Sequence, residues 1–187
     1  MPISDVCDRI GQYWNLPQTA TVQPHNLIGH AFRSVLVECL QTFGDPAISY
    51  EEEIDPRKEF PGFDFGTRSK AARIDIIGRR KGQLVAMISS RWRFRHDRVE
   101  VVEEALAYMT AARRTYGNCQ FYAWLGEFSA ARLEKVLTNC PPYRSNAALA
   151  ATVHFQPRLI SEGLGENGRL AHLKSLSWLI DQTFTWK

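Results

Sequence analysis

Four side chains near the middle of the chain have the types and spacing of a hydrolytic site. Asp75 interrupts the apolar run Arg-Ile-Asp-Ile-Ile, and Ser89 and Arg91 lie at the end of a second apolar run. Glu104 follows thirteen residues after Arg91. Carboxylates bind Mg²⁺ well, and a nearby cation can stabilise the negative charge that develops while a phosphodiester bond is broken. If the fold brings the four together, the expected chemistry is metal-assisted hydrolysis.

A hairpin is the element that must position the first three of these side chains. Residues 73–78 and 83–92 are rich in β-forming side chains, and the Arg-Arg-Lys-Gly segment between them favours a short connection. Alternate residues of a strand share a face, so Ser89 and Arg91 point the same way. If the strand register places Asp75 opposite this pair, the three side chains form a small polar site on an otherwise apolar sheet.

The helix after the hairpin carries the fourth side chain. Residues 97–116 have a helical period, and Glu104 lies near the edge of the apolar stripe. The stripe is formed by Val101, Ala105, Tyr108, Met109 and Ala112. The carboxylate of Glu104 can therefore be aimed back at the strand ends. A solvated or capping role near a helix start is the alternative.

The remaining periodicity predicts an α/β fold in one domain spanning residues 1–187, with a mixed sheet flanked by helices. A short helix is expected before residue 24, and a helix with one buried stripe follows it. The helix with the buried stripe spans residues 24–43. The further elements expected are strands at 48–54, 120–125 and 152–155, and helices at 129–138 and 170–186.

Composition limits the classes of protein to which the chain can belong. With 187 residues, 44% apolar and 23% charged, it is expected to fold as one globular domain. The net charge is only +3, but four arginines fall within residues 91–98, which favours a polyanionic partner. The four cysteines show no CxxC spacing, so free thiols are expected rather than a zinc site. No apolar stretch is long enough to span a bilayer, and a cytoplasmic protein is expected.

The run Ile88-Ser-Ser-Arg-Trp-Arg-Phe-Arg-His-Asp-Arg98, followed by Glu104-Ala105, resembles a known signature. It is similar to that of the CCGG-recognising type II restriction endonucleases of the PD-(D/E)XK superfamily. In that family a Ser-x-Lys strand end leads into Trp-x-x-Arg-x-Asp-Arg, and a displaced glutamate follows on the next helix. The resemblance covers about residues 73–105 and implies a restriction-endonuclease-like core.

The resemblance also implies roles for the residues that match the catalytic part of the signature. Asp75 would be a metal ligand, Ser89 would stand in the place of the usual acidic residue, and Glu104 would be the displaced acid. The main-chain carbonyl of Ser90 would face the Mg²⁺ ion. The position of the family's catalytic lysine holds Arg91, and an arginine is effectively never deprotonated, so it can stabilise charge but cannot act as a neutral amine.

Four further residues would contact double-stranded DNA. The resemblance implies that Arg95, Asp97 and Arg98 read the central CG base pairs. This is chemically sensible, because arginine can donate two hydrogen bonds to guanine and aspartate can accept one from cytosine. Arg93 completes the expected DNA-binding set. Because a palindrome presents two equivalent strands, the enzyme is expected to be a homodimer or a higher homo-oligomer.

Other interpretations of the same residues remain open. Asp97 can cap the helix in a capping box with Glu100, and the arginine-rich run can be a solvated edge. Asp75 can belong to an internal ion pair with Arg73 or a neighbouring strand. Glu38 can be a further metal ligand or a surface charge. The apolar side chains of the closing segment can form a dimer face or a core contact: Leu173, Leu176, Trp178, Ile180 and Trp186.

Three functions follow from these alternatives. The leading hypothesis is a Mg²⁺-dependent type II restriction endonuclease that cuts DNA at a short palindromic site. The second is a sequence-specific DNA-binding relative in which Arg91 has impaired catalysis. The third is a nuclease of the same fold that acts in repair or defence with little sequence specificity.

Overall fold

The computed structural model describes residues 24–65, 73–94, 100–158, 160 and 168–187, with side chains described from Ile28 onward. A five-stranded mixed sheet forms its centre, in the order β1-β2-β3-β4-β5. The first three strands pair antiparallel, and β3, β4 and β5 pair parallel. The strands are β1 (Ile48–Ile54), β2 (Ile74–Arg80), β3 (Gln83–Arg91), β4 (Gln120–Leu125) and β5 (Ala151–His154).

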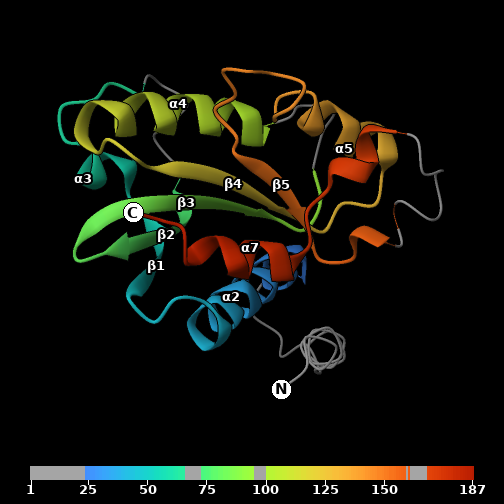
Figure 1. Cartoon of the computed structure of the whole chain (residues 1–187), viewed down its shortest axis with the longest axis horizontal. Coiled ribbons are helices and arrows are strands. Elements are labelled where there is room, and N and C mark those ends of the chain that lie inside the picture. Colours follow the sequence, from blue (N-terminus) through green and yellow to red (C-terminus); the bar gives the residue numbers. More distant parts are fainter. Residues whose placement is uncertain (1–23, 66–72, 95–99, 159, 161–167) are drawn as a thin grey trace.

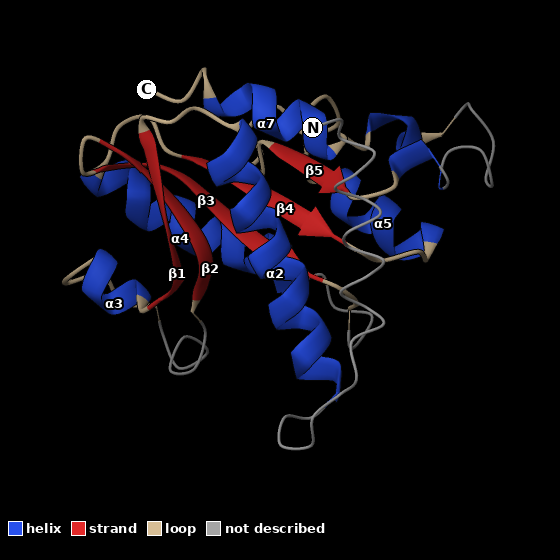
Figure 2. Cartoon of the chain, turned by 90° about the horizontal axis from the view of Figure 1, so that it is seen from below, coloured by secondary structure: helices blue, strands red, loops and turns tan. Residues whose placement is uncertain are grey.

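Helices cover both faces of the sheet (Figure 1). The α4 and α5 helices pack on one face, and α2 and α7 pack on the other, where α2 crosses the strands (Figure 2). The helices are α2 (Pro24–Phe43), α3 (Pro56–Glu59), α4 (Glu100–Thr115), α5 (Ala130–Leu137), the 3-10 helix η2 (Arg169–His172) and α7 (Leu176–Thr183). The predicted α/β class, with a mixed sheet flanked by helices, is confirmed.

The central strand β3 is apolar on both sides because helices lie on both sides of it. Met87 packs in the core under α4, whereas Ile88 packs in the core over α2. Strands buried on both faces are nearly continuous in apolar residues, and polar residues within them need partners. Ser89 and Ser90 are the buried polar residues at the end of this strand.

The predicted hairpin is confirmed, and its turn fixes the register. Lys81 and Gly82 both have positive φ, at 51° and 82°, as a two-residue turn of the type favoured between twisted strands requires. The turn pairs Arg80 with Gln83 and, beyond a bulge, Ile77 with Met87. Continued along both strands, this register brings the start of β2 beside the end of β3.

The prediction of a single closing helix over residues 170–186 is wrong. The chain forms η2, crosses the edge of β5 in an extended segment, and only then forms α7. Lys174 bridges to this edge: its N–H donates to the Thr152 carbonyl at 2.9 Å, and its carbonyl accepts from the His154 N–H at 2.8 Å. Ser175 then caps α7, accepting a hydrogen bond from the Trp178 N–H at 3.2 Å. Pairing with an open sheet edge has outweighed the helical period.

The apolar side chains of this closing segment belong to the cores on either side of the sheet. Leu176, Ile180 and Trp186 are buried against α2 and the sheet, and Leu173 is buried on the α5 side. Trp178 is partly buried against the same core as α7. The core interpretation of these residues therefore holds, and they do not form an exposed dimer face.

The structure also bears on the expected thiols and on the expected absence of a membrane span. Cys39, Cys119 and Cys140 are buried and are not joined in disulfides, in agreement with the expected thiols. Across the described ranges, no helix combines the length and the apolar character that crossing a membrane requires.

His154 is a fully buried histidine at the end of β5. Its Nδ1 accepts a hydrogen bond from the Gln156 N–H at 3.1 Å, so the proton must lie on Nε2, which is 3.0 Å from the Glu127 carbonyl. Burial lowers the pKa of His154 from its ordinary value of 6.5, although its hydrogen bonds and the Glu127 charge act in the opposite direction. The folded chain therefore holds this ring neutral.

The free energy of unfolding is expected to fall as the pH drops below about 6.5, because the unfolded chain then takes up a proton that folded His154 resists. Above that pH the ring is neutral in both states and contributes no pH dependence. His154→Gln should flatten this part of the profile, by up to one proton, in urea denaturation measured between about pH 5 and 8. The control is His172→Gln, at a half-buried position. An unchanged slope in His154→Gln would contradict the assignment.

Candidate active site

The four predicted side chains come together where β2 begins, β3 ends and α4 starts its second turn. Asp75 is a buried residue of β2, and Ser89 is a buried residue of β3. Arg91 ends β3 and is partly exposed, and Glu104 reaches the group from α4. Their convergence follows from the hairpin register and from the packing of α4 on the same face of the sheet.

The carboxylate of Asp75 is the centre of this cluster. Its Oδ2 atom accepts from the Ser90 main-chain N–H at 2.8 Å, from Arg91 Nη1 at 2.9 Å and from Ser89 Oγ at 3.3 Å. The ion pair with Arg91 is the neighbouring-strand alternative foreseen for Asp75. Arg73 is not its partner, since the Arg73 guanidinium donates to the Glu53 carbonyl instead.

Glu104 completes the cluster from the helix side. Its Oε2 atom accepts from Ser89 Oγ at 2.8 Å, and its Oε1 atom pairs with Arg91 Nη2. The Ser89 hydroxyl has one proton and lies 0.5 Å closer to Glu104 than to Asp75, so Glu104 is its better acceptor. Burial raises the pKa of Glu104, and the Asp75 charge adds to this effect, while Arg91 and Ser89 oppose it.

The Arg91 guanidinium lies between the two carboxylates. It pairs with Asp75 through Nη1 and with Glu104 through Nη2, and Nη1 is also 3.4 Å from the Ser90 carbonyl. Burial alone would lower the pKa of Arg91, but the charges of Glu104 and Asp75 outweigh it and raise the pKa. The guanidinium is therefore a permanent cation facing all three groups expected to bind Mg²⁺.

The residues present fit Mg²⁺ by donor type. Two carboxylates and one main-chain carbonyl are oxygen ligands of the kind that this ion prefers, with water and substrate oxygens supplying the rest. Among the residues that the structure describes, no cluster of three or more His, Cys, Asp or Glu side chains suits a metal ion. If Mg²⁺ binds here, the Ser90 carbonyl would be the third protein ligand, as the resemblance implies, and the Arg91 side chain, which now contacts all three groups, would have to move aside.

Other acidic side chains of the first half of the chain lie outside the cluster. Glu38 is exposed on α2, in agreement with its interpretation as a surface charge. Glu51 pairs with Arg79, and Glu52 and Glu53 pair with Arg33. The acidic run of β1 therefore has a structural role in ion pairs.

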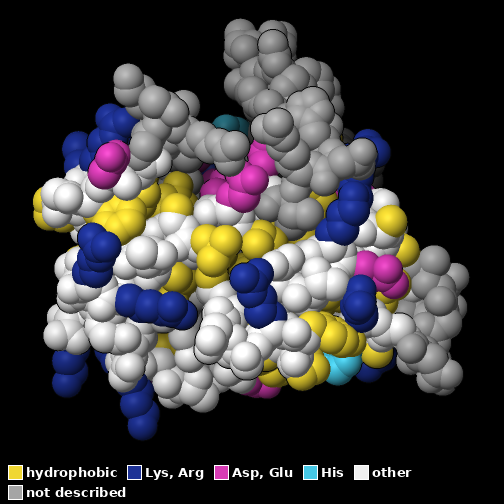
Figure 3. Space-filling model, turned by 90° about the horizontal axis from the view of Figure 1, so that it is seen from above, with side chains coloured by type: hydrophobic (Ala, Val, Ile, Leu, Met, Phe, Trp, Pro, Cys, Tyr) yellow, Lys and Arg dark blue, Asp and Glu magenta, His cyan; other side chains and the backbone are white. Residues whose placement is uncertain are grey.

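The expected DNA-reading residues are placed only in part. Arg93 is exposed just beyond the end of β3. Arg95, Asp97 and Arg98 lie outside the described residues, and so does the proposed Asp97 cap. On the face of the molecule covered by α4, Lys and Arg side chains are spread out rather than gathered in one patch (Figure 3).

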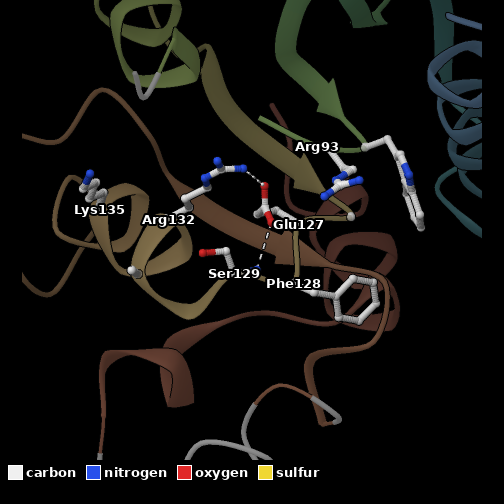
Figure 4. A pocket seen from close by; sticks show the side chains of 9 residues that line it. Arg93, Glu127, Phe128, Ser129, Arg132 and Lys135 are labelled. Atoms are coloured by element: carbon white, nitrogen blue, oxygen red, sulfur yellow. Dashed lines mark hydrogen bonds and ion pairs between the residues drawn. The ribbon is translucent and has the colours of Figure 1, made fainter. Parts of the chain in front are cut away.

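Sequence reasoning missed a pocket next to this cluster. Segment 126–128, between β4 and α5, forms one wall of a pocket of about 660 Å³. The lining residues are Trp92, Arg93, Gly126, Glu127, Phe128, Ser129, Ala131, Arg132 and Lys135 (Figure 4). The two basic residues of α5, three positions apart, were the available signal, since that spacing puts them on one helix face.

Gly126 shows how closely the two walls of this pocket meet. A Cβ atom at this position would lie 2.2 Å from the Trp92 ring, so only glycine fits. The Gly126 N–H also donates to the Arg91 carbonyl at 2.9 Å. The pocket wall is thus directly tied to the strand end that carries the candidate active site.

No family model matches this chain, and no curated protein matches it. The features that bear on function are the geometry of the cluster and the resemblance carried by residues 73–105.

Proposed function

We propose that this chain is a Mg²⁺-dependent type II restriction endonuclease with a PD-(D/E)XK core, which hydrolyses phosphodiester bonds of double-stranded DNA at a short palindromic site. CCGG is the candidate core of that site. The observation that carries the proposal is the convergence of Asp75, Ser89, Arg91 and Glu104. The signature assigns roles to these residues, and they come from three separate elements.

In this proposal the carboxylates of Asp75 and Glu104 and the carbonyl of Ser90 hold the metal ion. When bound, Mg²⁺ polarises a phosphoryl oxygen and lowers the pKa of a bound water. The Ser89 hydroxyl orients Glu104, and the Ser90 N–H orients Asp75. These contacts fix the directions of both carboxylates before substrate arrives, which limits the reorganisation needed during the reaction.

Arg91 has a different role from a catalytic lysine. Its raised pKa keeps the guanidinium charged, so it cannot accept a proton from the attacking water. Its planar set of donors is well suited to a phosphate group, which can replace the carboxylates as its partner. Arg91 therefore stabilises charge on the scissile phosphate, and the water proton leaves to solvent or to a substrate oxygen.

A second function is favoured by one specific observation. The guanidinium of Arg91 contacts every group assigned to the metal, so it can also hold the site closed to Mg²⁺. The chain would then be a sequence-specific DNA-binding protein that leaves its target intact. Both candidates bind DNA. They differ in whether the Arg91 side chain moves away so that Mg²⁺ can bind.

The deciding experiment incubates plasmid DNA rich in CCGG sites with the protein and Mg²⁺ or Mn²⁺, and compares the given chain with Arg91→Lys and Asp75→Ala. Discrete fragments that disappear in Asp75→Ala would support the restriction nuclease. Cutting by Arg91→Lys alone would support the impaired relative. Degradation to small fragments of arbitrary DNA would favour a repair or defence nuclease, and no cutting by any form would contradict the nuclease proposal. Glu38→Ala, at an exposed carboxylate, is the matched control.

Assembly and location complete the proposal. Cutting both strands of a palindrome needs two active sites related by a two-fold axis, so we expect a homodimer or a higher homo-oligomer. The protein would act in the cytoplasm, where incoming DNA is encountered. Sedimentation with and without a palindromic duplex measures the oligomeric state directly.

A further inference from the structure

The pocket beside the candidate active site has a strongly basic lining. Arg93 lies on one side of it, and Arg132 and Lys135 from α5 lie on the other (Figure 4). The one acidic side chain in the lining is Glu127. Three cations against one carboxylate leave a net charge of +2, which favours an anionic ligand.

The carboxylate of Glu127 is already hydrogen-bonded to groups of the protein. It accepts from the Ser129 N–H at 2.9 Å, from the Phe94 N–H at 3.2 Å and from Arg132 Nη1 at 3.3 Å. Burial would raise the pKa of Glu127, but these three donors outweigh it and lower the pKa. Glu127 thus balances the charge of Arg132 and joins the two walls, while Arg93 and Lys135 are exposed cations at the mouth.

An aromatic side chain stands beside these cations. Phe128 is 49% exposed, although it is among the largest apolar side chains of the described surface. It is held by edge contacts with Trp92, Phe155 and His154, with ring centroids 5.4–6.4 Å apart. A fixed aromatic ring that keeps half its surface free can stack on a planar ligand at little entropic cost.

The size of the pocket indicates how large an anionic ligand it can hold. Its volume of about 660 Å³ lies within the range of small-molecule sites and is far larger than a single phosphate needs. Cations at the mouth together with an exposed aromatic ring match the two parts of a nucleotide, its phosphate and its base. Proteins that bind single nucleic-acid strands combine the same two kinds of group.

We propose that this pocket binds one nucleotide unit, with its phosphate on Arg93 and Lys135 and its base against Phe128. The unit can belong to a nucleic-acid strand or be a free nucleotide. The strand form rests on the proposed DNA function. Arg93 follows Arg91 by two residues, which separates them by at most about 7 Å along the chain, so a strand with one phosphate at the candidate active site passes the pocket within a nucleotide or two.

The test measures binding, not cleavage, by titrating labelled single-stranded DNA, labelled duplex DNA and free deoxyadenosine monophosphate into the full chain. Phe128→Ala should weaken binding of the single strand roughly 10-fold or more, because a stacked base is lost. Lys135→Gln should lower the magnitude of the slope of log K against the logarithm of the salt concentration by about one, because one phosphate contact is lost. The matched controls are Leu106→Ala, at an exposed apolar residue of α4, and Lys58→Gln, at an exposed cation of α3.

The outcomes separate the sources of the ligand. Loss of strand binding in both pocket variants, with no binding of the free nucleotide, supports a strand-bound unit. Weakened binding of the free nucleotide supports a free ligand. Unchanged affinities in both variants would overturn the inference. An oligonucleotide carrying 5-iodouracil gives a second readout on the unaltered chain: photocrosslinks should fall within residues 126–135, and crosslinks elsewhere only would also overturn it.

The result is independent of the proposed nuclease activity. Plasmid cleavage that depends on Asp75, with normal affinities in the pocket variants, would remove the pocket inference and leave the nuclease standing. Nucleotide binding that depends on Phe128, without any cleavage, would support the pocket inference and remove the nuclease proposal.

Discussion

Asp75→Asn is expected to lower the rate of DNA cleavage by roughly 10³-fold or more, while the affinity for DNA changes only a few-fold. Asparagine has nearly the same shape and keeps an oxygen that can accept from the Ser90 N–H, so the strand ends should stay in place. It lacks the negative charge that a metal ligand must supply. Single-turnover cleavage and filter binding on the same duplex measure the two effects separately.

The control for this substitution is Glu38→Gln, which removes one carboxylate from the exposed side of α2 and should leave both quantities unchanged. Thermal unfolding of Asp75→Asn checks that the fold survives, since the charge of Arg91 keeps Glu104 as a partner. If Asp75→Asn cuts DNA at the normal rate, the cluster is not the catalytic site.

Arg91→Met is expected to lower the free energy of unfolding by about 2 to 3 kcal/mol. The substitution removes the only cation within contact of Asp75 and Glu104 among the interactions described, and leaves two neighbouring carboxylates facing each other. The side chains of Arg91, Asp75 and Glu104 are only 27%, 11% and 17% exposed, so water replaces the lost partner incompletely. Urea denaturation in the presence of a chelator measures this loss.

The same variant should bind divalent cations more tightly, by roughly 10-fold or more, because a competing charge at contact distance has been removed. Mg²⁺ should then restore much of the lost stability of Arg91→Met, while the unaltered chain gains little. Arg91→Lys keeps the charge and should show neither effect in full. The control is Arg113→Met, at an exposed position of α4. Equal stabilisation of the unaltered chain and of Arg91→Met by Mg²⁺ would show that Arg91 does not compete with the metal.

The candidate site was accessible from the sequence because its parts are close along the chain. Residues 73–92 form one hairpin, and alternation along its strands indicates which side chains share a face. The two-residue turn at Lys81 and Gly82 then sets the register. The helical period of α4 adds Glu104 on the same side, with all five predicted inward residues buried. Local rules of this kind need no knowledge of distant parts of the chain.

The end of the chain shows where such rules fail. Residues 170–186 have a helical pattern of apolar side chains, and most of those side chains are indeed buried in the core. The backbone nevertheless leaves the helix at Lys174 to pair with β5. The free hydrogen-bonding groups of that edge exist only after the sheet has formed, so no local pattern can reveal them.

The position of the Arg91 side chain and the basic pocket depend on tertiary structure in the same way. The spacing of the signature predicted that Arg91 lies near two carboxylates, but the contact of its guanidinium with Glu104, in addition to Asp75 and Ser90 of the hairpin, comes from the packing of α4 against the strand ends. The two walls of the pocket are joined by a hydrogen bond from the Phe94 N–H to the Glu127 carboxylate, between residues 33 positions apart. The sequence by itself therefore determined most of the elements, their buried faces and the four clustered side chains Asp75, Ser89, Arg91 and Glu104. The tertiary structure decided which distant groups meet, because long-range contacts form only when several elements pack together.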